Sequence, residues 1–264
     1  MPVIQAKDLL QAGAQFGHST SHWNPKMAPY ILGKKNKIHI INLRETVKGL
    51  VAACYFAKKL IAQGRQILFV GTKRQAQEII ETQGRRCEMP YVRERWLGGT
   101  LTNLETIQSR VQRLLDLESD HESGEVNKHS KKMQSSLRRE LRKVKRNLDG
   151  IRNMKQLPGA LFVVDPKHDH TAVREARRLA VPIIAVLDTD ADPDDVDLPI
   201  PANDDALRSI DLIVSKFADA VIEGHSYRKE HPELARRVQE EAHQRQMAAT
   251  SQSVGSYTAG ARGR

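Results

Sequence analysis

Two histidines, His18 and His22, lie four residues apart in the segment FGHSTSHWNPKM, a spacing at which one helical face can present two metal ligands. A zinc protease of the His-Glu-x-x-His pattern needs a glutamate directly after the first histidine, and this chain has Ser19 there. Pro25 also disfavours helical geometry at the residue before it, Asn24. We therefore predict an ordered loop in which both histidines hydrogen-bond or pack.

A dense group of aspartates follows in DTDADPDDVDLP, residues 188–199, and in NDD, residues 203–205. Their oxygens could bind Mg²⁺ or Ca²⁺, but the run lacks the glycine and the distal glutamate of an EF-hand loop. We favour helix capping by Asp204 or Asp205. The alternative is a single ion that bridges His18 to Asp188 or Asp205. We expect neither a metal nor a cofactor.

A third candidate for chemistry is the turn Gly71-Thr72-Lys73 at the end of ILFVGTK, where a strand gives way to a helix. A P-loop requires a second glycine and Lys-Ser/Thr, but Lys73 is followed by Arg74. No Gly-x-Gly-x-x-Gly, Gly-x-Ser-x-Gly or reactive-thiol pattern is present. We predict no enzymatic activity. The alternative is an α/β phosphate- or nucleotide-binding enzyme that uses this turn.

The segment RERWLGGTLTN, residues 93–103, combines glycines, a tryptophan and hydrogen-bonding side chains. Gly98 and Gly99 allow positive φ or a close backbone approach. We expect a hinge with Trp96 packed on the sheet. We also expect it to press against phosphates with help from Thr100, Thr102 and Asn103.

Charge is distributed unevenly along the 264 residues. The formal net charge is +10, and the first 100 residues alone carry a net +10, whereas residues 161–224 carry a net −8. Residues 128–155 hold 11 Lys and Arg against only Glu140 and Asp149, too many for i,i+4 pairing to neutralise. The sequence therefore predicts that one surface attracts a polyanion and another turns away from it.

Short apolar strands alternate with amphipathic helices, which predicts an α/β fold with a parallel sheet covered on both faces. The predicted strands are 37–42, 66–71, 160–165, 181–190 and a short one near 198–203. The predicted helices are 44–63, 72–84, 171–180 and 204–224, with Gly64 and Gly84 ending the first two.

Residues 101–157 interrupt this alternation with two apolar stripes at helical spacing. The stripes are Leu101, Leu104, Ile107, Val111, Leu114 and Leu115, then Met133, Leu137, Leu141, Val144, Leu148 and Ile151. A polar connection around Gly124 separates them, which indicates an inserted antiparallel α-helical (coiled-coil) hairpin.

The resulting organisation is an α/β RNA-binding globular domain made of 1–100 and 158–224, the basic hairpin 101–157, and a C-terminal helix with a disordered tail over 225–264. Cys54 and Cys87 are expected to be buried, reduced thiols. No apolar run approaches the roughly 18–20 residues of a membrane span, and the first residues lack a signal-peptide layout. We expect a cytoplasmic protein that contacts no membrane.

Several long segments resemble the bacterial-type ribosomal protein S2 family of the small subunit, from about residue 6 to about residue 224. They are AGAQFGHSTSHWNPKMAPYILGKKNKIHIINL (12–43), ILFVGTKRQA (67–76), RWLGGTLTN (95–103), LPGALFVVDPKHDH (157–170) and PIIAVLDTDADPDDVDLPIPANDDALRSI (182–210). The resemblance implies a flavodoxin-like, doubly wound sheet with a protruding hairpin. It also implies a non-catalytic, structural component of the bacterial ribosome, with small-subunit ribosomal RNA and neighbouring ribosomal proteins as partners. One implied partner is the large mRNA-capturing protein, and no small-molecule substrate is implied.

We expect basic residues of the first half and the hairpin to contact RNA through its backbone and shape rather than its base edges. The candidate RNA-binding residues are Lys26, Lys34, Lys35, Lys37, Lys73, Arg74, Arg93, Arg95, Asn103, Arg138, Arg139, Arg142 and Lys143.

Overall fold

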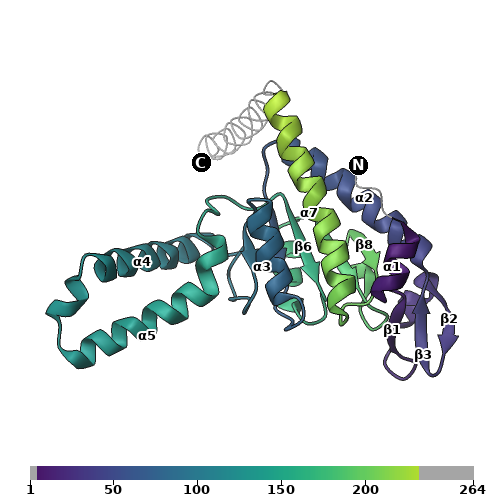
Figure 1. The fold of residues 1–264 in the computed structure, drawn as a ribbon, viewed down its shortest axis with the longest axis horizontal. Helices are drawn as coiled ribbons and strands as arrows, with labels where there is room; N and C mark the ends of the chain where they lie inside the picture. Colours follow the sequence, from purple (N-terminus) through teal and green to yellow (C-terminus); the bar gives the residue numbers. More distant parts are fainter. Residues whose placement is uncertain (1–4, 232–264) are drawn as a thin grey trace, which may run out of the picture.

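A parallel sheet flanked by helices forms the body of the protein in the computed structural model, which describes residues 5–231 (Figure 1). The sheet order is β5-β4-β6-β7-β8, and every neighbouring pair is parallel. Its strands are β4 (Ile67–Val70), β5 (Tyr91–Val92), β6 (Ala160–Val164), β7 (Ile183–Leu187) and β8 (Leu198–Pro201). The helices around it are α1 (Ala6–Ala12), α2 (Leu43–Ala62), α3 (Gln77–Arg86), α6 (His170–Arg178) and α7 (Leu207–Glu230). The predicted α/β class with a parallel sheet is confirmed.

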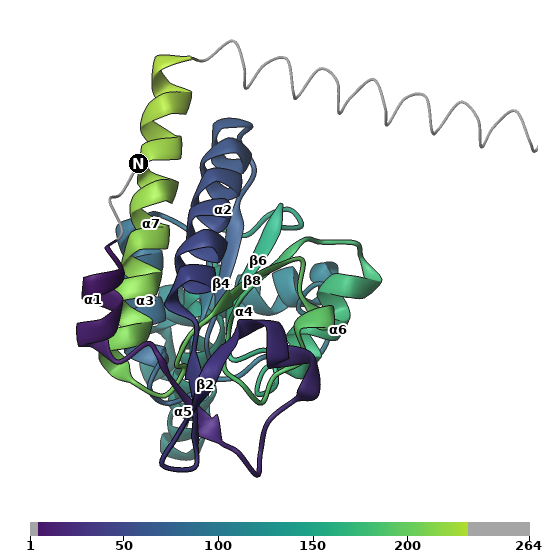
Figure 2. The same cartoon turned by 90° about the vertical axis from the view of Figure 1, so that its right-hand side faces the viewer.

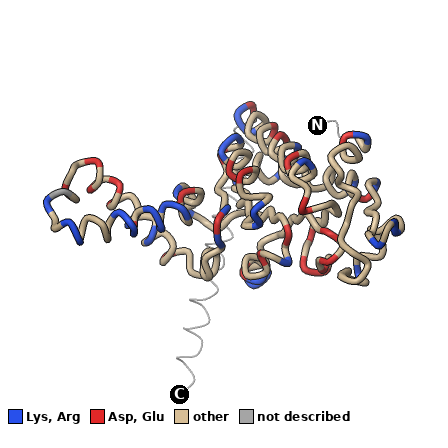
Figure 3. The backbone as a smooth tube through the Cα atoms, turned by 60° about the horizontal axis from the view of Figure 1, so that its bottom comes forward, with Lys and Arg blue, Asp and Glu red and all other residues tan. Residues whose placement is uncertain are grey.

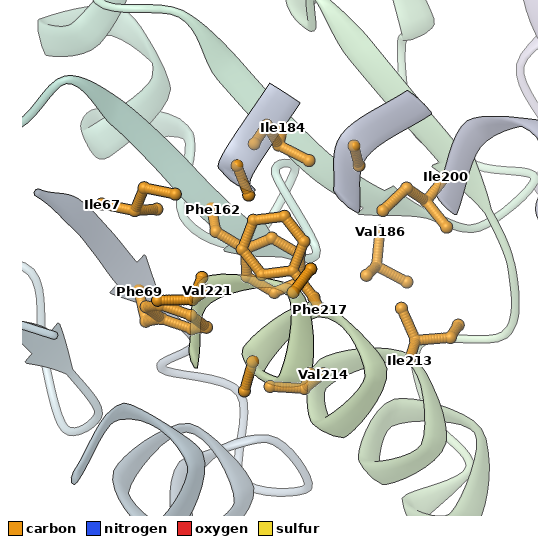
Figure 4. Close-up of a cluster of buried hydrophobic side chains, with 14 of the residues drawn as sticks. Ile67, Phe69, Phe162, Ile184, Val186, Ile200, Ile213, Val214, Phe217 and Val221 are labelled. Atoms are coloured by element: carbon orange, nitrogen blue, oxygen red, sulfur yellow. The ribbon is translucent and has the colours of Figure 1, made fainter. Parts of the chain in front are cut away.

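Both faces of this sheet are buried, because successive residues of a strand point to opposite sides. On one side Phe69 and Phe162 pack against Phe217 of α7, with ring centroids 4.3–5.6 Å apart (Figure 4). On the other side Leu68 and Val163 join a second apolar cluster. Strands buried on both faces explain the continuous apolar runs that identified them in the sequence. Among the described residues, none of the helices combines the length and the apolar character that a membrane span requires.

A second, antiparallel sheet lies beside the first and was not expected. It has the order β1-β3-β2 and consists of β1 (Phe16–Ser19), β2 (Ile31–Lys35) and β3 (Ile38–Ile41). The strand predicted at 37–42 exists as β3, but its placement in the parallel sheet was wrong. Asn36 and Lys37 join β2 to β3, with φ of 51° and 61°. Positive φ at both residues is the geometry of a type I′ hairpin turn, and it turns the chain back on itself.

Two predicted helix boundaries also differ from the structure. α3 begins at Gln77 rather than at residue 72, and it runs through Gly84 to Arg86. A Cβ at Gly84 would lie 3.0 Å from the Tyr91 ring, so this glycine serves packing and does not end the helix. α7 likewise continues past Gly224 to Glu230. The helix and disordered tail predicted beyond this point fall on residues 232–264, outside the described residues.

The predicted hairpin protrudes from the sheet as two adjacent antiparallel helices, α4 (Leu104–Glu122) and α5 (Lys131–Leu148) (Figure 1). Glu118 of α4 pairs with Lys145 of α5 at 2.9 Å and with Arg152 at 2.6 Å. The hydrogen bond from Arg152 lowers the pKa of Glu118 to about 2. At the base, Leu148 and Ile151 enter the apolar cluster of Leu68 and Val163, so the arm is anchored to the sheet.

The cysteines lie as expected. Cys54 and Cys87 are both buried and free. Burial raises the pKa of each thiol to about 12, so neither forms a thiolate near neutral pH. The division into two domains and a tail, by contrast, remains a proposal.

Candidate nucleic-acid interface

The outer face of α5 presents a row of cations, of which only Arg146 approaches a carboxylate in the described structure, that of Glu94 at 3.9 Å. Arg139, Arg142, Lys143 and Arg146 line one shallow hollow of about 580 Å³. Their spacing of three and four residues places them on one side of the helix. Together with Arg138, three of them form the predicted hairpin set, and all four predicted residues are exposed. Among residues 5–231, Arg138, Arg139, Arg142 and Lys143 make no salt bridge to a carboxylate. Lys and Arg dominate one helix of the protruding arm (Figure 3).

A second group of free cations sits on the small antiparallel sheet. Lys34, Lys35 and Lys37 are exposed on β2 and on the turn that joins it to β3. No carboxylate within the described part of the chain pairs with them. Leu32, on the same strand, is 72% exposed. We call the α5 row and this turn the two cationic surfaces.

The loop between β5 and α4 is organised by one buried carboxylate, Glu175 of α6. Glu175 accepts hydrogen bonds from Trp96 Nε1 at 3.0 Å and from the backbone N–H groups of Gly99 (2.8 Å), Leu101 (2.9 Å) and Thr102 (3.1 Å). The Thr102 hydroxyl donates a fifth bond at 3.2 Å. Burial alone would raise the pKa of Glu175, but these hydrogen bonds lower it overall. The carboxylate stays ionised inside the protein and fixes the loop.

The hydrogen bonds to Glu175 bear on the packing and phosphate-contact roles that the sequence predicts for residues 93–103. Trp96 is buried against the second apolar cluster, as predicted. Thr100 is also buried and donates to the Leu97 carbonyl, which leaves it no exposed hydroxyl for a phosphate. Asn103 is the N-cap of α4 and accepts a hydrogen bond from the Thr106 N–H at 3.4 Å. Arg93 pairs with Glu81, whereas Arg95 is exposed and makes no such pair in the described structure.

Lys73 lies among aspartates rather than beside a free phosphate site. Its Nζ is 2.7 Å from Asp204 Oδ1, 2.6 Å from Asp205 Oδ1 and 3.3 Å from Asp165 Oδ2. Burial lowers the pKa of Lys73, but these carboxylates raise it by more. A nucleotide at the Gly71-Thr72-Lys73 turn would therefore face carboxylates on three sides.

His18 joins the same carboxylate group from β1. Its Nδ1 lies 3.0 Å from Asp188 Oδ2, and its Nε2 lies 3.6 Å from Asp205 Oδ2. The hydrogen bond with Asp188 raises the pKa of His18 to about 9, so the ring is an imidazolium at neutral pH. Burial, with the charges of Asp165 and Asp188, raises the pKa of Asp204 to about 7. His22 is exposed and lies outside this group.

The group has the spacing of a metal site. One atom each of His18, Asp188 and Asp204 lies within 4.8 Å of the others, so these three residues could hold an ion. The set contains Asp204 where the sequence suggested Asp205. The predicted cap role of these aspartates was wrong, because Ala206 is the N-cap and Asn203 Oδ1 accepts from Asp205 N and Ala206 N. Lys73 and the His18 imidazolium already supply positive charge to the carboxylates.

Two other predicted RNA-binding residues, Lys26 and Arg74, lie outside the two cationic surfaces. Lys26 pairs with Asp192 at 2.8 Å and with Asp194 at 2.6 Å on the surface. Arg74 is exposed and makes no salt bridge within residues 5–231. Sequence reasoning missed the role of Glu175, whose five donors lie more than seventy residues before it in the chain.

The residues described above lie within the part of the chain that resembles known proteins. Residues 9–224 match the family model for ribosomal protein S2. The chain is 56% identical over 218 residues to the small ribosomal subunit protein uS2 of Rhodopirellula baltica, covering 83% of this chain and 84% of that protein. It is also 51% identical over 226 residues to the small ribosomal subunit protein uS2c of Rhodomonas salina, covering 86% of this chain and 93% of that protein.

Replacing Glu175 tests its control of the loop. Glu175→Ala leaves the buried donors of Trp96 and Leu101 and the partly buried donor of Gly99 without an acceptor, and we expect it to lower the free energy of unfolding by about 3 kcal/mol or more. Glu175→Gln retains one acceptor oxygen and should lose less. Urea unfolding followed by tryptophan fluorescence measures both. A loss below about 1 kcal/mol for the alanine variant would contradict this role.

The His18 pair predicts a pH dependence of stability. The folded pKa of about 9 is above the usual 6.5, so the pair's contribution is complete below about pH 6.5 and is lost as pH rises through 9. Urea unfolding at pH 6.5 and 9.5 should show a larger drop for the wild-type chain than for His18→Gln. Equal drops in the two proteins would show that His18 gains no proton affinity on folding.

Proposed function

Because this chain belongs to the ribosomal protein S2 family, we propose that it is a structural component of the small ribosomal subunit and binds that subunit's RNA through the two cationic surfaces. The family consists of ribosomal proteins and is not an enzyme family. Participation in translation within a ribonucleoprotein follows from this membership. A location in the cytoplasm of a bacterium belongs to the same proposal.

The observation that carries RNA binding is the contrast between paired and unpaired charge. Arg138, Arg139 and Arg142 protrude on an anchored arm without carboxylate partners in the described structure. Lys73 and Lys26, by contrast, are already neutralised. Only a cation that lacks an internal partner can replace the counterions of a phosphate without first breaking a salt bridge.

The hairpin arm and the β2–β3 turn are suited to recognise RNA by its shape. A-form RNA displays its phosphates and 2′-hydroxyls, whereas its deep major groove hides the base edges. The α5 row therefore contacts the backbone, and affinity comes from phosphate neutralisation. If on the order of eight phosphates are engaged, the slope of log affinity against log salt is roughly −6 to −7.

In this proposal, neighbouring ribosomal proteins bind the acidic surface of the molecule. The connection between β7 and β8 includes three carboxylates, Asp192, Asp194 and Asp195, against the two cations that pair with them, Lys26 and Arg177, so its excess negative charge repels RNA. A basic surface of another ribosomal protein fits there. The proposed partners include the large mRNA-capturing protein of the subunit.

Removing the α5 charges tests the proposal. We expect Arg138→Ala, Arg139→Ala, Arg142→Ala and Lys143→Ala, combined in one variant, to reduce the salt slope for small-subunit RNA by about 3–4 and to leave the fold intact. Filter binding across a salt series measures the slope, and circular dichroism checks the fold.

The matched control removes four exposed cations of α2, α6 and α7 that make no salt bridge in the described structure: Arg44, Lys59, Arg178 and Arg208. It has the same change in net charge. The proposal fails if the control variant and the α5 variant lose affinity equally, since only total charge would then matter.

A further inference from the structure

A groove runs along the amino-terminal edge of the parallel sheet, opposite the edge that holds Asp188 and Asp204. We define this amino-end groove by residues 64–66, 84–85, 88–91, 149–150, 152–153 and 155–157 with His225 and Arg228 of α7. It consists of adjoining cavities of about 580 and 450 Å³ that share Gln66, Glu88, Met89 and Asn153. The carboxyl ends of α2 and α7 lie on this side of the sheet, toward the top of Figure 1. It contains none of the predicted RNA-binding residues.

The groove is cationic. Its lining has five arginine and lysine side chains and two carboxylates, Glu88 and Asp149. Asp149 already pairs with Arg85 at 3.2 Å and with Arg152 at 2.7 Å. The remaining cations are Arg65, Lys155 and Arg228, and none of the three makes a salt bridge within the described residues. The second cavity therefore holds these three unpaired cations against one carboxylate, Glu88, and keeps a net positive charge that can meet an anion.

Two glycines set the positions of the arginines. A Cβ at Gly64, where φ is +82°, would lie 3.1 Å from Cζ of Arg228. A Cβ at Gly159 would lie 2.8 Å from Cβ and 2.9 Å from Nε of Arg65. Both side chains thus rest against bare backbone on the walls of the groove.

Between these cations the groove offers neutral groups. Gln66, Asn153 and Gln156 supply amides, and Leu157 is 45% exposed. We propose that the amino-end groove binds the sugar–phosphate backbone of an unpaired RNA strand, with Arg65, Lys155 and Arg228 at the phosphates and Leu157 against a ribose or base. This inference rests on the proposed function, which supplies RNA as the polyanion.

The presence of both charged and amide side chains in the lining favours RNA over an acidic protein segment. An RNA strand presents a phosphate at every nucleotide with a ribose 2′-hydroxyl between phosphates, and the amides can bond the hydroxyl as donor or acceptor. A glutamate-rich peptide would use the cations and leave the amides and Leu157 with little to contact.

The test uses the full chain and a fluorescent twelve-nucleotide unpaired RNA. Arg65→Ala with Arg228→Ala should weaken binding roughly tenfold and reduce the salt slope by about 1.4, the value for two phosphates of a single strand. The matched control, Arg44→Ala with Arg208→Ala, removes two exposed cations near the opposite ends of α2 and α7 and should change affinity less than twofold. Equal effects of the two variants on fluorescence anisotropy would overturn the inference.

Two further measurements distinguish failure of this inference from failure of the proposed function. If the groove variant loses affinity for a glutamate-rich peptide but binds the RNA normally, the groove is a protein site and the inference is wrong. If the α5 variant keeps full affinity for small-subunit RNA, the proposed function fails. The comparison of the groove variant with its own control still decides the inference in that case.

Discussion

A buried carboxylate determines where the arm of this protein leaves the sheet. Glu175 gathers Trp96 and the backbone of Gly99, Leu101 and Thr102 around its two oxygens, and α4 starts directly after this loop. An ionised carboxylate is costly to bury unless donors surround it, so loop and carboxylate stabilise one another. At the other end of the hairpin, Leu148 anchors α5 in the apolar cluster. The α5 cations are therefore presented from a fixed base, which lowers the entropy lost on binding.

Many α/β proteins bind ligands at the carboxyl ends of their parallel strands. In this protein ion pairs occupy those ends. Lys73 and His18 lie among Asp165, Asp188 and Asp204, and these ion pairs connect β1 to the ends of the sheet strands. The acidic edge is thus largely an internal structural network. Among the described residues, cations without a carboxylate partner lie on other elements, including α5, the β2–β3 turn and the amino-end groove. The structure thus separates paired charge at the carboxyl ends of the strands from unpaired positive charge on other elements, and only the unpaired cations are free to attract a polyanion.

The sequence predicted those parts of the fold whose signals are local. β4, β6 and β7 were found because buried parallel strands are continuous apolar runs, and the hairpin because both helices keep apolar stripes. β1 and β2 were missed, since short strands with exposed polar residues have no such pattern. Exposure of Arg138 and Arg142 could be predicted from the excess of charge on one helix. The neutralisation of Lys73 could not, because Asp165 and Asp204 approach it only when distant strands align at one edge.

Ultraviolet cross-linking inside cells tests the central claim, that unpaired cations on fixed elements hold RNA, most directly. Small subunits are purified on a sucrose gradient, and the peptides of this chain that carry RNA are identified by mass spectrometry. We predict RNA-linked peptides from α5 (Lys131–Leu148) and from the β2–β3 region (Ile31–Ile41). Cross-links confined to the acidic residues 188–205, or absence of the chain from small subunits, would contradict the claim.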